Sequence, residues 1–204
     1  MEITGATLGP AALACVAVHG RDQDPGYMAE HLVTPVGLPD VAWVLPAADG
    51  GSWYPGRFDD PREANEPWLS RALAEIDAAL AHVAAAGVPF GRTVLAGFSQ
   101  GACLVADHVA RRPAPYAGIA VLTGALIGAP GDVPPVAPLG GLPVLMATAR
   151  DDEWVPLEYV EMTARAFEAA GGSVELVIDE APEHAISPAA AAAVRTLFER
   201  ARPA

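Results

Sequence analysis

Short apolar runs alternate with longer helical patterns along the chain. Continuous apolar runs of this length predict buried strands, here over residues 13–18, 41–45, 93–97, 119–122, 144–147 and 174–178. Apolar residues at helical spacing predict helices between them, over residues 25–33, 65–87, 100–112, 155–171 and from Ser187-Pro188 onward. Strands that alternate with helices are typical of a mainly parallel sheet with helices on both faces. We therefore expect a single α/β domain over residues 1–204.

Two long connections interrupt this alternation. Residues 46–64 are rich in Gly, Pro, Asp and Arg but also contain Trp53, Tyr54 and Phe58. A connection of this length within a compact domain is usually functional or disordered, and the aromatic residues argue against disorder. Residues 124–142 form a second, Pro/Gly-rich connection.

Composition and charge exclude several classes of chemistry. Hydrophobic residues make up 52% of the 204 residues, as in globular proteins. The formal net charge of −13 makes nucleic acid a poor partner. All 12 basic residues are arginine, so neither a lysine Schiff base nor a Walker A lysine is available.

The same composition bears on location and cofactors. No apolar stretch reaches the roughly 18 residues that a membrane span needs, and the N-terminus has no basic region typical of a secretory signal; we therefore expect a cytoplasmic protein. Cys15 and Cys103 lie in apolar sequence, which favours buried free thiols. The five histidines form no metal-binding pattern. We expect neither a metal nor a cofactor.

The sequence Gly97-Phe98-Ser99-Gln100-Gly101 fits the pattern G-x-S-x-G. It lies between a predicted strand and a predicted helix, the context in which such a serine is held above the sheet on a tight turn. The helix N-terminus there favours a developing negative charge. The pattern therefore predicts that Ser99 is a nucleophile, although a purely structural turn is the alternative.

A serine nucleophile needs a base, and the base needs an orienting acid. In α/β-hydrolases the chain order is serine, acid, histidine. Of the two histidines after Ser99, His108 lies within the helix that Ser99 precedes and cannot fold back, which leaves His184. The acid should follow the strand over 144–147, where Asp151, Asp152 and Glu153 compete. Composition does not choose among these three.

An oxyanion hole needs one N–H from the residue after the nucleophile and one from the loop after the first strand. Gln100 supplies the first, and the Arg21 N–H in His19-Gly20-Arg21 is the candidate for the second. An ordinary turn at the strand end is the alternative interpretation of that loop.

These residues together resemble the phospholipase/carboxylesterase family, the acyl-protein thioesterase-like branch of the α/β-hydrolases. The resemblance covers nearly the whole chain and rests on four segments: Val18-His19-Gly20-Arg21, Gly97-Phe98-Ser99-Gln100-Gly101, Asp152-Glu153-Trp154-Val155-Pro156 and Glu183-His184. The family carries its catalytic acid at the first position of D-x-x-V-P, which implies Asp152. Relatives often have glycine in place of Asp22. The resemblance also implies an α/β-hydrolase fold without a cap domain.

The resulting hypothesis is a carboxylesterase or thioesterase with the triad Ser99, Asp152 and His184. Its substrate would be a small acyl ester, and a homodimer is a possible assembly. Trp53, Tyr54, Phe58 and Trp154 are candidates for the substrate pocket, with packing beneath a long loop as the alternative. The same triad would serve a peptidase or a lactone hydrolase. A binding module that has lost turnover is the alternative from another class.

Overall fold

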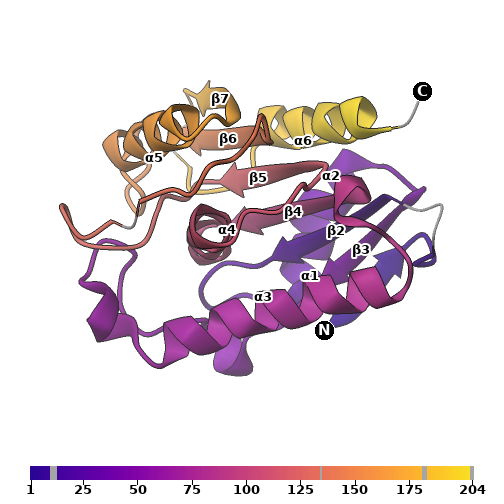
Figure 1. Ribbon diagram of the computed structural model, residues 1–204, viewed down its shortest axis with the longest axis horizontal. Helices are drawn as coiled ribbons and strands as arrows, with labels where there is room; N and C mark the ends of the chain where they lie inside the picture. Colours follow the sequence, from indigo (N-terminus) through magenta and orange to yellow (C-terminus); the bar gives the residue numbers. More distant parts are fainter. Residues whose placement is uncertain (10–12, 134, 181–182, 203–204) are drawn as a thin grey trace.

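The computed structural model describes residues 1–9, 13–133, 135–180 and 183–202. Seven strands of this part of the chain form one sheet in the order β1-β3-β2-β4-β5-β6-β7 (Figure 1). All neighbours are parallel except β1 and β3. The strands are β1 (Glu2–Gly5), β2 (Leu13–Val18), β3 (Val41–Leu45), β4 (Thr93–Phe98), β5 (Gly118–Leu122), β6 (Pro143–Ala149) and β7 (Ser173–Asp179).

Helices cover both faces of the sheet. The α-helices are α1 (Pro25–Met28), α2 (Thr34–Val36), α3 (Trp68–Ala85), α4 (Gln100–Arg111), α5 (Leu157–Ala169) and α6 (Pro188–Ala201). Side chains of β2 alternate between two cores: Val16 packs with α3, α4 and α5, whereas Cys15 packs with α1 and α6. This two-sided burial explains the continuous apolar runs of the central strands. The predicted α/β-hydrolase architecture is confirmed.

The helix boundaries follow local signals. Asp24 caps α1, accepting a hydrogen bond from the Tyr27 N–H at 3.0 Å, and the Ser187 hydroxyl caps α6 through the Ala190 N–H at 3.1 Å. Gly87 and Gly171 have positive φ just after α3 and α5, as helix ends often require. Within the described ranges, no helix is both long and apolar enough to cross a bilayer.

The structure differs from the predicted elements in two places. The four-residue strand β1 was not predicted, because its residues are all exposed and its apolar content is low; pairing with β3 at the sheet edge stabilises it. The first helical segment also does not end at Val33. It continues through a π-helical turn, Ala29–Val33, into α2 and ends at Gly37, whose φ of 62° is left-handed.

The connection between β3 and α3 is an ordered loop. It contains two 3-10 turns, Asp49–Gly51 and Arg62–Asn65. Arg62 anchors the second turn to α4 through an ion pair with the buried Asp107, which also pairs with Arg111. Burial raises the pKa of Asp107, and the two guanidinium groups oppose that rise. The loop is thus fixed to the helix that follows Ser99.

Acid should destabilise the fold before its carboxylates titrate. His108 is 2% exposed on α4, and burial lowers its pKa below the ordinary value. The unfolded chain therefore binds a proton more readily than the native chain, and stability falls as pH drops below about 6.5. We expect urea unfolding to give a free energy that decreases from pH 7.5 to pH 5.5, with a smaller decrease in His108→Gln. An equal decrease in both proteins would contradict this origin.

Candidate active site

Ser99 occupies a strained turn between β4 and α4. Its backbone has φ 53° and ψ −119°, a region that a residue with a side chain rarely adopts. Hydrogen bonds fix this turn on both sides: the Ser99 N–H donates to Leu122 O at 2.9 Å, and the Ser99 carbonyl accepts from Cys103 N at 3.0 Å. The turn lifts the serine hydroxyl to the carboxyl edge of the sheet, where it is half-buried.

The glycines around Ser99 are required by close backbone packing. A Cβ at Gly97 would overlap the carbonyl of Gly101, and a Cβ at Gly101 would overlap the carbonyls of Val18 and His19. The first turn of α4 therefore rests directly on the end of β2. This explains why glycine stands at both ends of the G-x-S-x-G pattern.

His184 and Asp152 lie in line with Ser99. The Nε2 atom of His184 is 2.7 Å from Ser99 Oγ, and its Nδ1 atom is 2.7 Å from Asp152 Oδ2. The three residues follow β4, β6 and β7, whose carboxyl ends meet at one edge of the sheet. The structure thus brings together the serine, the histidine and the acid that the resemblance implies.

The Asp152 carboxylate is held in its ionised form. The side chain is fully buried, and its Oδ1 atom accepts the Trp154 N–H at 2.8 Å and the Val155 N–H at 2.9 Å. Burial alone would raise the pKa of Asp152, but the hydrogen bonds from His184, Val155 and Trp154 together hold it below its ordinary value. Its neighbours Asp151 and Glu153 are exposed.

Aromatic rings restrict the His184 imidazole. The Phe98 ring lies 5.2 Å from it and the Trp154 ring 6.3 Å, measured between ring centroids. Trp154 is 60% exposed, so the histidine is partly open to solvent on that side. His108, the other histidine after Ser99, is instead buried beside Tyr116.

The turn after β2 leaves one peptide N–H free beside Ser99. The Gly20 N–H donates to Gln23 Oε1 at 2.9 Å, and the Asp22 N–H donates to Gly51 O at 2.8 Å. Within the part of the chain that the structure describes, the Arg21 N–H between them has no acceptor. The Gln100 N–H begins α4 and likewise has no acceptor inside the helix.

The side chains of the two oxyanion-hole candidates hold the long loop in place. Gln100 accepts the Trp53 N–H at 2.9 Å and donates to the Tyr54 carbonyl at 2.8 Å. The Arg21 guanidinium donates to Ser52 Oγ at 3.3 Å and to the carbonyls of Pro55 and Gly56. It also lies 5.9 Å from the centre of the Tyr54 ring.

A cavity of about 450 Å³ opens at Ser99 and His184. Of the four aromatic residues that the sequence suggested for the pocket, Tyr54, Phe58 and Trp154 line it. Trp53 is not among the lining residues. Its ring lies tilted against His19, with 4.8 Å between ring centroids, and its indole N–H donates to His19 O at 2.8 Å. The packing interpretation therefore applies to Trp53.

Sequence reasoning missed several residues of the cavity wall. Gln23, Arg57, Asp60 and Cys103 also line it. No motif marked them, because their positions depend on how loops distant in sequence pack together. Cys103 is a buried free thiol as predicted, and burial raises its pKa to about 12, so it stays a neutral thiol.

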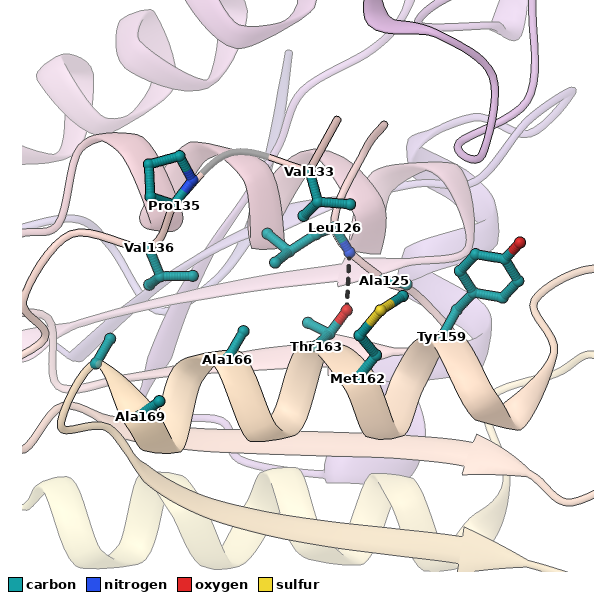
Figure 2. A pocket seen from close by; sticks show the side chains of 11 residues that line it. Ala125, Leu126, Val133, Pro135, Val136, Tyr159, Met162, Thr163, Ala166 and Ala169 are labelled. Atoms are coloured by element: carbon teal, nitrogen blue, oxygen red, sulfur yellow. Dashed lines mark hydrogen bonds between the residues drawn. The ribbon is translucent and has the colours of Figure 1, made fainter. Parts of the chain in front are cut away.

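A second cavity, of about 410 Å³, lies against α5 (Figure 2). Its lining is almost wholly apolar, and one hydrogen bond from the Leu126 N–H to Thr163 Oγ1 crosses it. It contains no nucleophile paired with a base, so it does not compete with the Ser99 cavity as the reaction site. Its Tyr159 packs edge-on against Phe58 of the first cavity, with 5.2 Å between ring centroids.

Metal-ligating side chains do not gather in the described ranges: no group of three or more His, Cys, Asp or Glu residues there could hold an ion. The site consequently offers nucleophilic and acid–base groups rather than a ligand set.

Comparison with known proteins adds the family. A solved phospholipase/carboxylesterase from Dyadobacter fermentans is 30% identical with a TM-score of 0.85, over 97% of this chain and 95% of that one. Esterase PE8 is 24% identical with a TM-score of 0.80, over 98% of each chain. SOBER1 of Arabidopsis thaliana is 20% identical with a TM-score of 0.76, over 94% of this chain and 99% of its own. The last two likenesses show the fold alone. Comparison with curated proteins yields no match.

A family model also covers most of the sequence. The model described as phospholipase/carboxylesterase matches residues 9–199, which include every residue of the Ser99 site. With the mainly parallel sheet and the 30% identity to a solved member, this settles the class of protein. The chain belongs to the phospholipase/carboxylesterase family of α/β-hydrolases and is a carboxylesterase/phospholipase-type hydrolase.

Proposed function

We propose that this hydrolase cleaves carboxylic esters, and thioesters among them, through an acyl-enzyme formed on Ser99. His184 acts as general base and acid, and Asp152 orients its ring. The observation that carries the proposal is the pair of 2.7 Å contacts that link Ser99 Oγ, His184 and Asp152.

In the acylation step, Ser99 Oγ attacks the carbonyl carbon while His184 Nε2 takes the hydroxyl proton. Asp152 holds the Nδ1–H of the ring and stabilises the imidazolium that results. The tetrahedral intermediate collapses when the bond to the leaving alcohol or thiol breaks, and His184 returns the proton to that group. The low pKa of Asp152 supports this role, because a carboxylate and not a carboxylic acid must face the imidazolium.

The negative charge on the carbonyl oxygen would be stabilised by the backbone N–H groups of Arg21 and Gln100. Neither has another acceptor among the described residues, so neither has to break a hydrogen bond within them when the oxyanion forms. A single donor of this kind accounts for about 10²–10³ in kcat in serine hydrolases.

In the deacylation step, a water activated by His184 attacks the acyl-enzyme and releases the acid.

The wall of the cavity favours an uncharged, partly apolar acyl group. Tyr54, Phe58 and Val155 contribute apolar surface. The charged groups of the lining lie at Arg21, Asp22, Arg57 and Asp60. The Arg57 side chain is paired with Asp59 at 2.9 Å and is therefore less available to an anionic substrate. A neutral ester fits this distribution best.

The expectations of a homodimer and of a cytoplasmic location stay predictions.

Phe58 is expected to limit the length of the acyl chain. It lies between the Ser99 cavity and the apolar cavity on α5, edge-on to Tyr159. Phe58→Ala should raise kcat/KM for p-nitrophenyl decanoate relative to the acetate by about tenfold, because several methylenes gain apolar surroundings. The measurement is a series of p-nitrophenyl esters of increasing chain length.

The matched control is Phe90→Ala, which truncates a phenylalanine that packs against Tyr116 instead. Its chain-length profile should follow the wild type. A Phe58→Ala profile parallel to that of the wild type would show that Phe58 does not set the limit.

A further inference from the structure

The peptide that carries the Arg21 N–H is held at its Gly20 carbonyl by His19 Nδ1, 2.7 Å away, and the peptides on either side are held by hydrogen bonds of their own. The preceding peptide donates its Gly20 N–H to the Gln23 side chain, and the following one donates its Asp22 N–H to Gly51 O. The second bond comes from the backbone of another loop. The first depends on a single side-chain amide oxygen, three residues further along the chain.

The Gln23 side chain also interacts with Tyr27. Besides accepting the Gly20 N–H, it hydrogen-bonds to the Tyr27 hydroxyl, which opposes the rise that burial causes in the pKa of Tyr27. The Tyr27 ring stacks on Phe98, 5.4 Å away between centroids, and Phe98 in turn contacts the His184 ring. Gln23 thus connects the turn after β2 to Tyr27, whose ring packs on Phe98 and through it on His184.

The fit around Gly20 is tight. A Cβ at Gly20 would lie 2.8 Å from Gln23 Oε1 and 3.1 Å from Ser99 Cβ. A side chain at position 20 would therefore displace the Gln23 amide from its hydrogen bond with the Gly20 N–H. Without the Gln23 acceptor, the Gly20 N–H would need a new partner, and the turn would shift to reach one.

We propose that Gln23 is a positioning residue that aims the Arg21 N–H at the oxyanion. The inference rests on the proposed function, since it assigns Gln23 a task in the same reaction. Among the described residues Gln23 forms no hydrogen bond with Ser99 or His184; it acts through the Gly20 peptide. Misplacement of a catalytic group by about 1 Å costs on the order of 10²-fold in rate, so removal of this acceptor should reduce kcat by about 10- to 100-fold.

The test is steady-state hydrolysis of p-nitrophenyl acetate by three variants. Gln23→Met keeps the length of the side chain but loses the amide, and should lower kcat by about 10- to 100-fold while KM changes by less than about threefold. Gln23→Glu retains an acceptor and should keep a kcat at least about tenfold above that of Gln23→Met, measured in about 0.5 M salt to screen the added charge. Tyr27→Phe removes the other partner of Gln23 and should leave kcat within about threefold of the wild type.

A boronic acid that forms a tetrahedral adduct with Ser99 provides the second readout. Its inhibition constant should weaken in Gln23→Met by about the factor lost in kcat, since it reports the oxyanion hole directly. Wild-type kcat and boronate affinity in Gln23→Met would overturn the inference, as would equal losses in Gln23→Met and Gln23→Glu. If Ser99 of the wild type forms no acyl-enzyme, the proposed function fails first, whatever Gln23 does.

Discussion

Ser99→Ala is expected to reduce kcat for ester hydrolysis by about 10⁵-fold while the fold remains intact. The change removes the atom that attacks the substrate carbonyl in the acylation step of the proposed mechanism. Alanine can occupy the same strained backbone position, and the hydrogen bonds of the Ser99 peptide groups to Leu122 and Cys103 are unaffected. The measurement is kcat on p-nitrophenyl acetate, together with a thermal melt that shows the variant to be folded.

Ser70→Ala serves as the control for this variant. Ser70 lies exposed on α3 and hydrogen-bonds only to Glu66 among the side chains described. Its loss should leave kcat unchanged. A folded Ser99→Ala protein that keeps a tenth or more of the activity would end the assignment of Ser99 as nucleophile.

Asp152→Asn is expected to lower kcat by about 10⁴-fold. Asparagine preserves the size of the side chain but removes the charge that favours the imidazolium. Its amide can also donate to Nδ1, which would leave the imidazole in the wrong tautomer to accept the serine proton. The measurement is kcat on a neutral ester, at a pH where the wild type is fully active.

Two neighbouring carboxylates supply matched controls. Asp151 and Glu153 are exposed, and among the described residues it is Asp152 that hydrogen-bonds to His184 Nδ1. Asp151→Asn and Glu153→Gln should each change kcat by less than about threefold. If Asp151→Asn proves the damaging substitution, the acid has been assigned one residue too late.

Local sequence predicted the turn at Ser99 and the edge of the sheet where the candidate site lies, whereas the choice of Asp152 over Asp151 and Glu153 came from the family resemblance. A glycine-flanked serine between an apolar strand and a helix predicts a tight turn. In the structure a Cβ added at Gly97 or Gly101 would overlap neighbouring backbone atoms, as such a turn requires. Because the central strands are parallel, residues that follow β4, β6 and β7 meet at one edge. The chain order of Ser99, Asp152 and His184 therefore carried information about their distance in space.

The loops were less predictable, because their conformations depend on partners far away in sequence. The side chain of Gln100 reaches Trp53 and Tyr54, 47 and 46 residues earlier in the chain. Periodicity could not tell that Tyr54 would face the cavity while Trp53 packs beneath it. The sequence does not predict strand β1 for a related reason. Its stability comes from pairing with β3 and not from its own apolar content.

Covalent labelling with a fluorophosphonate tests the central claim, a nucleophilic Ser99 activated by His184. Intact-protein mass spectrometry should show one adduct per chain, and peptide mapping should locate it on the peptide that contains Ser99. The adduct should be absent in Ser99→Ala and form far more slowly in His184→Ala, because the serine hydroxyl then lacks its base. An enzyme that hydrolyses esters but acquires no adduct, or acquires it on another residue, would contradict the account.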